Sequence, residues 1–302
     1  MHKGINGKVR GHIGAIFTVG VWGTTFISSK LLLAEFTPFQ LLFSRFLLGY
    51  LFLWLICPKV LKPQGKKEEG IFALAGLLGI TSYYFVENIA LTYTNASNVG
   101  VVVSLAPFFT VLLAKWLTAE KQVNGYFYVG LVVALSGIAI ISFGSFSELK
   151  IHPVGDFLGI LAAFIWAAYS LLSRKISEFG HNLLLATRRT LFYGLLFMLP
   201  ILLFSKESFP RISEWSSDAV LNILFLGIGA SAICFVTWNY SVSVLGAVQA
   251  SMYIYAVPAI TVITSVLFLK ESFTPAVALG TFLTTAGLFL SEKSSSKEIE
   301  YD

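Results

Sequence analysis

Charged side chains lie deep inside long apolar stretches of this sequence, and their types suggest the chemistry that the chain could perform. The clearest cases are Arg45, Glu87, Arg188 and Arg189. An ionisable group is costly inside a membrane, so binding or proton transfer is the default hypothesis for it. Arg45 and Arg189 could hold a substrate carboxylate through paired hydrogen bonds, and Glu87 could contact a substrate or carry a proton. The alternative is structural: arginines bound to loop carbonyls, or a packed ion pair.

Arg45 and Glu87 are predicted to lie at similar depth. Arg45 lies seven residues into the apolar range 38–57, which is about 10 Å of helix, and Glu87 lies about 8 Å before the end of the range 70–92. Leaving either charge alone in a low-dielectric interior would be costly. We therefore expect an Arg45–Glu87 pair.

Some aromatic and amide side chains are candidates for lining a cavity. Aromatic residues make up 15% of the sequence, and most are expected to face lipid or the membrane interface. The exceptions have polar or repeat-matched neighbours, and they are Trp22, Tyr84, Trp166, Tyr169, Trp238, Tyr253 and Tyr255. A cavity lined by such aromatic rings would suit amphipathic or cationic metabolites. Asn88 and Asn239 must face another helix or water. They could line the cavity, or they could serve only to form hydrogen bonds between helices.

The elements that must position these residues are membrane helices. The sequence is 56% hydrophobic and 12% charged, against about 25% charged in soluble domains. A membrane helix needs about 20 mostly apolar residues. Ten ranges qualify: 12–33, 38–57, 70–92, 97–117, 124–143, 154–173, 183–204, 219–241, 246–268 and 275–291. We predict an all-α integral membrane protein with ten transmembrane helices.

The distribution of Lys and Arg predicts the orientation. Most of them fall on one side of the ten-helix arrangement, which the positive-inside rule assigns to the cytoplasm together with both termini. The net charge of +5 is then an orientation signal for a protein in contact with lipid, and nucleic acid is not an expected partner. Residues 293–302 are polar and are predicted to form a disordered cytoplasmic tail. We expect the cell membrane as the location.

The sequence contains an internal repeat, residues 1–150 and 151–292, with five predicted helices in each half. A shift of 144 residues superposes Trp22 on Trp166, Ser29 on Ser173, Lys30 on Arg174 and Arg45 on Arg189. A shift of 151 superposes Gly76 on Gly227, Asn88 on Asn239, Ala96 on Ala247, Pro107 on Pro258 and Glu120 on Glu271. Because five is odd, the halves enter the membrane from opposite sides. Two inverted repeats are typical of secondary transporters.

Two matched prolines interrupt predicted helices. Pro107 and Pro258 each remove a backbone hydrogen bond in mid-helix. Matched interruptions in two halves point to a transporter's binding site. We therefore predict a gating or cavity-lining role, with simple helix curvature as the alternative.

Short motifs along the whole chain resemble the EamA-type pattern of the drug/metabolite transporter superfamily. In the first half they are Trp22-Gly23-Thr24-Thr25-Phe26, Arg45, Asn95-Ala96-Ser97, Leu105-Ala106-Pro107 and Thr118-Ala119-Glu120. In the second half they are Trp166, Arg189, Gly246-Ala247, Ala256-Val257-Pro258 and Leu269-Lys270-Glu271. The resemblance implies ten helices in two inverted five-helix halves that export amino acids or other small metabolites. The second half departs from the pattern at Ala167, which stands where the first half has Gly23.

The expected function is a secondary transporter, an exporter that moves a small-molecule substrate by alternating access. The rival hypotheses are an intramembrane enzyme and a channel-like protein. An enzyme needs a nucleophile and base or metal ligands at depth, whereas the histidines lie near helix ends or in loops: His2, His12, His152 and His181. We expect no enzymatic activity, cofactor or metal. Proton coupling and the choice between monomer and homodimer stay open.

Overall fold

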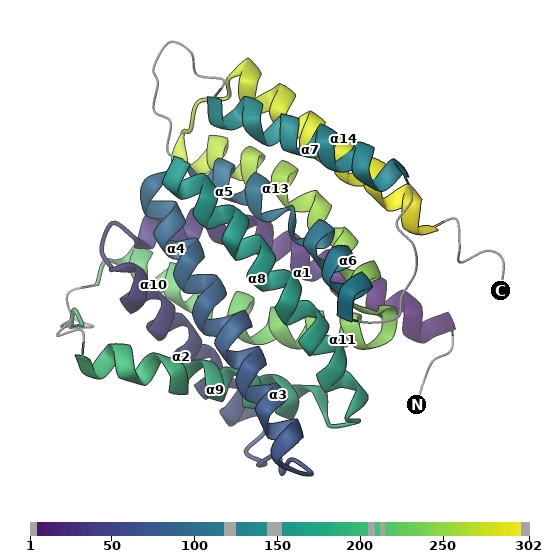
Figure 1. Ribbon diagram of the computed structural model, residues 1–302. Helices are drawn as coiled ribbons and strands as arrows, with labels where there is room; N and C mark the ends of the chain where they lie inside the picture. The colour runs from purple at the N-terminus through teal and green to yellow at the C-terminus, as the bar shows by residue number, and fades with distance from the viewer. Residues whose placement is uncertain (1–4, 118–124, 144–152, 205–208, 212–214, 297–302) are drawn as a thin grey trace.

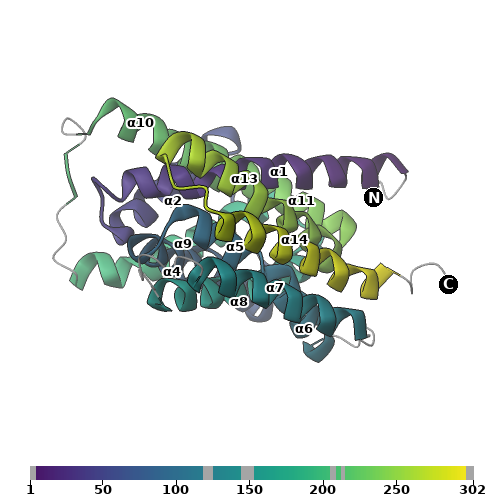
Figure 2. The same cartoon turned by 90° about the horizontal axis from the view of Figure 1, so that it is seen from above.

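The computed structural model describes residues 5–117, 125–143, 153–204, 209–211 and 215–296, and every regular element in these ranges is helical. The helices lie side by side as a bundle (Figure 1). The first helix begins and the last helix ends at the same end of the bundle (Figure 2). We call this the Gly11 end, and the opposite end, where the first helix finishes, the Leu32 end. The predicted all-helical fold is confirmed for the described residues.

The first half contains helices α1 to α7. Their bounds are α1 (Ile5–Leu32), α2 (Pro38–Ile56), α3 (Lys66–Gly76), the π-helix η1 (Leu77–Ser82), α4 (Tyr83–Tyr93), α5 (Ala96–Val103), α6 (Ala106–Leu117) and α7 (Gly125–Phe143). Elements α3, η1 and α4 follow one another without a break, so they form one long helix. Helices α5 and α6 are separated only by a turn at Ser104 and Leu105. Residues 118–120, the end of the first-half motif, lie outside the described residues.

The second half contains helices α8 to α14. Their bounds are α8 (Pro153–Glu178), α9 (Leu183–Phe204), α10 (Ser217–Leu224), the π-helix η3 (Phe225–Ile233), α11 (Cys234–Leu245), α12 (Ala247–Ser251), the 3-10 helix η4 (Met252–Ala256), α13 (Val257–Thr264), the π-helix η5 (Ser265–Leu269) and α14 (Pro275–Ser296). Helix α14 reaches Ser296 and so enters the segment predicted to be a tail, of which residues 297–302 lie outside the described residues.

Eight helical stretches of the described chain are long and apolar enough to cross a membrane. They are Gly7–Leu32, Pro38–Ile56, Lys66–Tyr93, Ala96–Leu117, Pro153–Glu178, Leu183–Phe204, Ser217–Leu245 and Ala247–Leu269. Helix α7 contributes a shorter apolar stretch, Tyr128–Ile140, and α14 is not among the eight. A helical protein that crosses the membrane many times is therefore supported, while the exact count of ten and the inverted relation of the halves stay predictions.

Local sequence signals explain where several helices begin and end. Thr37 and Gln40 form a capping box before α2: the Gln40 amide N–H donates to Thr37 Oγ1 (3.2 Å), and the Thr37 amide N–H donates to Gln40 Oε1 (2.8 Å). Pro38 occupies the first helical position, where its missing N–H costs nothing. Gly246 ends α11 with a φ of 90°, a conformation that glycine adopts without a steric penalty.

The long helices are interrupted at matched places in the two halves. Shifting η1 by 151 residues places it on 228–233, inside η3. The same shift places the turn before Pro107 on η4, which precedes Pro258. Such interruptions change the direction of side chains and free backbone carbonyls from the regular helical pattern. Both prolines therefore follow a break in a helix, although their gating role stays a prediction.

Packing between the halves follows reciprocal pairs. Helix α1 packs against α11 as α8 packs against α4, and α2 packs against η3 as α9 packs against η1. Helix α5 packs against α13, and α7 lies along α14 at the edge of the bundle (Figure 1). Glycine permits this last contact, because a Cβ atom at Gly137 would lie 2.5 Å from the carbonyl oxygen of Gly280. Reciprocal pairs are what an approximate twofold relation between halves would produce.

Candidate binding site between the two halves

A cluster of buried aromatic rings lies where the two halves meet. The matched residues Trp22 and Trp166 contact each other edge to face, with ring centroids 5.0 Å apart and planes at 89°. Trp238 lies 5.2 Å from Trp22, and Phe235 lies 5.6 Å from Trp22. We call the following residues the aromatic cluster: Trp22, Phe46, Tyr83, Tyr84, Trp166, Tyr169, Phe235 and Trp238. Helices of both halves contribute to it, so relative movement of the halves would change its shape.

The three tryptophans of the cluster differ in their hydrogen bonds. The Trp22 indole N–H donates to the carbonyl of Ala230, 3.1 Å away in the π-helix η3. The indole nitrogens of Trp166 and Trp238 are buried and have no hydrogen-bond partner among the described residues. A buried donor without a partner costs free energy. These two N–H groups therefore have hydrogen-bonding capacity that the described residues do not use.

Arg45 lies beside the aromatic cluster with its guanidinium only partly bonded. The side chain is 0% exposed. Its Nε donates to Ser231 Oγ at 3.0 Å, and its guanidinium carbon lies 4.4 Å from the centre of the Tyr84 ring. Both terminal nitrogens, Nη1 and Nη2, are buried without a partner among the described residues. Two free NH2 groups on one guanidinium match the paired acceptors of a carboxylate.

Glu87 is also buried, and it does not form the ion pair expected with Arg45. No ion pair of the described residues joins the two side chains. Glu87 interacts with the Tyr83 hydroxyl and, at longer range, with Arg45, and its Oε1 has no hydrogen-bond partner. The prediction of a direct pair was wrong because Arg45 turns towards Ser231 and the face of Tyr84. The similar depth of Arg45 and Glu87 in the membrane predicts neither how the two helices are rotated about their axes nor where the two side chains point.

Asn88 and Asn239 occupy matched positions but have different partners. Asn239 Oδ1 accepts hydrogen bonds from Tyr169 (3.2 Å) and Ser173 (2.7 Å), and its amide nitrogen donates to Thr187 Oγ1 (2.8 Å). The amide nitrogen of Asn88 donates to the carbonyl of Pro38 at 3.1 Å, while Asn88 Oδ1 has no partner among the described residues. Asn239 thus holds Tyr169 of the aromatic cluster in place.

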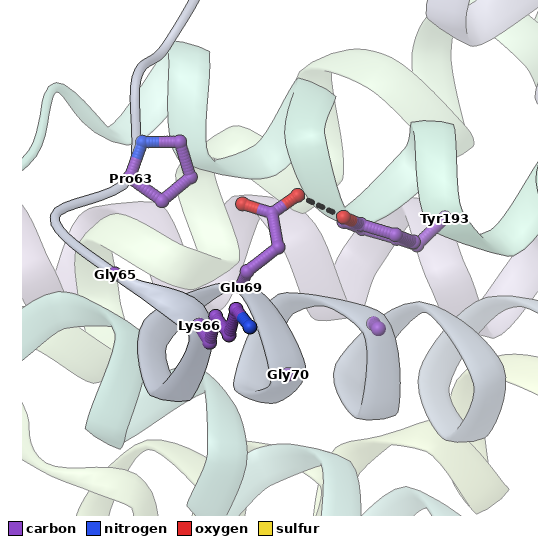
Figure 3. Close-up of a pocket in the computed structure, with 7 residues that line it drawn as sticks. Pro63, Gly65, Lys66, Glu69, Gly70 and Tyr193 are labelled. Carbon is purple, nitrogen blue, oxygen red and sulfur yellow. Dashed lines mark hydrogen bonds between the residues drawn. The ribbon is translucent and has the colours of Figure 1, made fainter.

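Arg189, the repeat partner of Arg45, lies away from the aromatic cluster. Its guanidinium binds the carboxylate of Glu69 near the start of α3, and the Tyr193 hydroxyl donates to the same carboxylate (Figure 3). Glu69 and Tyr193 border a pocket of about 450 Å³, whose other lining residues are Pro63, Gly65, Lys66, Gly70 and Ala73. The structure therefore does not bring the two matched arginines together.

The different partners of the two arginines have a cause in the sequence. Helix α9, which carries Arg189, packs against α3, whereas Arg45 on α2 bonds to Ser231 of η3. Shifting Glu69 by 151 residues gives Val220, so the second half has no carboxylate at the position that pairs with Arg189. Arg45 is left with unused donors.

The remaining predicted residues have other surroundings. Tyr253 is half-buried and its hydroxyl is 2.5 Å from His12 Nδ1. Tyr255 is buried and packs edge to face on Phe289 of α14. Pro107 and Pro258 are both buried at the start of their helical segments. The structure thus joins Trp22, Trp166, Trp238, Tyr84 and Tyr169 in one cluster with Arg45 and Glu87 beside it.

Several residues of the site were not predicted. Phe235 contacts both tryptophans Trp22 and Trp166, and its position four residues before Asn239 on the same helix face was the available signal. Tyr83 could have been found as the neighbour of Tyr84. Ser231 gave no signal, because its role depends on the π-helix. Among the described residues no group of three or more His, Cys, Asp or Glu could hold a metal ion.

Comparison with known proteins places this architecture in a family. The profile of the EamA-like transporter family matches residues 9–143 and again residues 153–292. A protein of Archaeoglobus fulgidus, named an uncharacterized transporter, is 30% identical over 285 residues, which cover 92% of this chain and 96% of that protein. A protein of Streptantibioticus cattleyicolor named "Probable terminal-alkyne amino-acid exporter" is 24% identical over 91% of each chain.

A solved crystal structure shares the fold. It superposes with a TM-score of 0.68 at 21% sequence identity and covers 96% of this chain and 99% of that chain. The two profile matches cover most of the sequence, and the apolar helices account for a membrane location. The chain therefore belongs to the EamA-like transporter family of the drug/metabolite transporter superfamily, and it is a multi-pass membrane transporter of small molecules.

Proposed function

We propose that this protein is a secondary transporter that exports amino acids or related small metabolites by alternating access. The observation that carries the proposal is the buried guanidinium of Arg45, with two unpaired nitrogens, beside the aromatic cluster and the carboxylate of Glu87. A protein interior rarely leaves so many buried polar atoms without partners. A substrate that supplies the missing partners explains them.

The free polar atoms are complementary to a zwitterion. A substrate carboxylate would accept from Nη1 and Nη2 of Arg45. A substrate ammonium would lie near Glu87 and over an aromatic ring face, where cations are attracted. The indole N–H groups of Trp166 and Trp238 would donate to further acceptors on the substrate. An α-amino acid carries this pair of charges, and the name of the Streptantibioticus cattleyicolor relative indicates the same substrate class.

The movement we propose is a rocking of two inverted five-helix halves. The reciprocal packing of α1 on α11 and α8 on α4 supports it, as do the matched π-helices η1 and η3. Helices α7 and α14 complete the ten crossings, and both termini are cytoplasmic. Because Trp22 and Trp166 come from opposite halves and contact each other, the substrate site lies on the plane about which the halves rock. Pro107 and Pro258 mark the helix breaks that bend.

Transport should be tested with purified protein in liposomes. Uptake of a panel of amino acids, amines and nucleosides is measured with and without a pH gradient. We expect uptake of at least one zwitterionic amino acid, its loss in Arg45→Gln, and its retention in the control Lys175→Gln, because Lys175 is exposed and pairs only with Glu178 in the described structure. Uptake of an amine or nucleoside that does not depend on Arg45 would refute the proposed substrate class, and no uptake of any member would count against transport of these classes.

A further inference from the structure

Two matched serine–asparagine pairs lie at opposite ends of the bundle. In the second half, Ser173 Oγ donates to Asn239 Oδ1 at 2.7 Å, and both residues are buried. In the first half, the matched residues Ser29 and Asn88 are each 0% exposed. Ser29 Oγ and Asn88 Oδ1 have no hydrogen-bond partner among the described residues. The same donor and acceptor types are thus bonded in one half and unbonded in the other.

The cations next to the two serines behave alike, so the difference between the halves does not extend to them. Lys30 Nζ donates to the carbonyls of Leu91 and Thr94 at the end of α4. Arg174, the repeat partner of Lys30, donates from Nη1 to the carbonyl of Ser243 near the end of α11, at 2.9 Å. Each cation therefore holds the carboxyl end of the helix that carries the asparagine. The two helix pairs are clamped in the same way.

A contact between distant helices fixes the ends at which the two pairs lie. The Ser241 hydroxyl on α11 donates to the carbonyl of Gly11 on α1 at 2.8 Å. Asn239 is two residues from Ser241, so the bonded pair belongs to the Gly11 end. Ser29 lies three residues before the end of α1 at Leu32, so the unbonded pair belongs to the Leu32 end.

We infer that the two pairs are alternating latches: the Ser29–Asn88 hydrogen bond forms when the Leu32 end closes, and the Ser173–Asn239 bond breaks as the Gly11 end opens. The inference rests on the proposed alternating access, and it adds that helices within each half shift as the halves rock, because each pair joins two helices of one half. In inverted repeats the second conformation is the first with the roles of the halves exchanged. A buried donor and acceptor left unpaired destabilise the present state, and pairing them offsets the loss of the other bond. The two states thus stay close in free energy, as a switching element requires.

Matched alanine variants test the resting asymmetry without any substrate. Hydrogen exchange is measured by mass spectrometry on the full chain in lipid nanodiscs, for peptides covering 83–93 and 234–245. Ser173→Ala should exchange about fivefold faster at 234–245, as expected when one buried hydrogen bond is lost. Ser29→Ala should leave exchange at 83–93 unchanged, because the bond is absent in this state. Equal acceleration by Ser29→Ala at 83–93 would overturn the inference.

Disulfide trapping tests the reciprocal step. In a Cys57→Ala and Cys234→Ala background, the pair Ser29→Cys with Asn88→Cys is oxidised and the fraction cross-linked is measured by mass. The Ser29–Asn88 cross-link should raise the rate of exchange at 234–245, and reduction of the disulfide should return that rate to its starting value. The pair Ser173→Cys with Asn239→Cys is the matched control. Its cross-link holds the present state, so the rate of exchange at 83–93 should equal that of the wild type.

The outcomes separate the latch from the proposed transport. A Ser29–Asn88 cross-link that leaves 234–245 unchanged, or a failure to cross-link where the control pair succeeds, overturns the latch even if liposome uptake is normal. If neither pair cross-links, the alanine comparison decides. Absence of uptake with the expected exchange results would instead remove the proposed substrate while leaving the coupled latches in place.

Discussion

Arg45→Met is expected to stabilise the protein while abolishing transport. Methionine keeps an unbranched stem that reaches about as far as arginine Nε, but it has no charge and no donor. In the structure Arg45 makes one hydrogen bond, to Ser231, and one cation–π contact, to Tyr84, and it leaves two buried nitrogens unpaired. An arginine kept for a substrate should cost stability in the absence of that substrate, and the size of this cost follows from these contacts.

The magnitude comes from comparing what the substitution removes. The hydrogen bond from a charged group to Ser231 contributes about 1.5–3 kcal/mol, and the desolvated cation–π contact contributes about 2 kcal/mol. Against these, each unpaired nitrogen costs about 1–3 kcal/mol, and an uncompensated buried charge costs several kcal/mol more. The lost attraction between Arg45 and Glu87 reduces the gain. We therefore expect the free energy of unfolding to rise by about 1–3 kcal/mol.

The assay measures unfolding in mixed micelles and uptake in liposomes on the same preparations. Arg188→Met is the matched control: Arg188 is buried as well, but its guanidinium donates to the carbonyls of Cys57 and Lys59. Its removal takes away both of these charge-assisted hydrogen bonds, so it should destabilise the protein by about 2–4 kcal/mol. If Arg45→Met destabilised the protein as much as Arg188→Met, the guanidinium would be a structural group and our reasoning would be refuted.

Three further predictions concern a buried acid, a close helix contact and the topology. Glu87→Gln should fold and should lose any dependence of transport on a pH gradient, because the amide cannot carry the proton; uptake that still follows pH would exclude Glu87 as the proton site. Gly137→Ala should lower the free energy of unfolding by about 1–3 kcal/mol through overpacking, whereas Gly20→Ala, with open space around its Cβ, should not. A reporter active only in the cytoplasm should work after Asp302 and fail at Glu207, and the reverse pattern would invert the orientation.

The helices could be predicted because apolarity and end signals act locally. The range 38–57 became Pro38–Ile56, since its length fits the membrane and Pro38 marks its start. The repeat also placed Trp22 and Trp166 in related positions, and their contact follows from that relation. Depth alone could not predict the partners of Arg45, because a helix can be rotated about its axis at constant depth. The π-helix that presents Ser231 depends on tertiary packing and leaves no periodic signal in the sequence.

Residues at matched positions in the two halves form different hydrogen bonds, although the fold is duplicated. Arg189 is paired with Glu69, while the position that corresponds to Glu69 is Val220 and Arg45 bonds to Ser231 of η3. The Trp22 indole is bonded to a carbonyl of η3, while the Trp166 indole is not bonded in the described structure. In each pair one member is bonded more fully than its repeat partner: Arg189 leaves only Nε without a partner in the described structure, whereas Arg45 leaves Nη1 and Nη2. A single difference at a partner position, valine where the other half has a carboxylate, therefore removes a structural ion pair from one half and keeps it in the other.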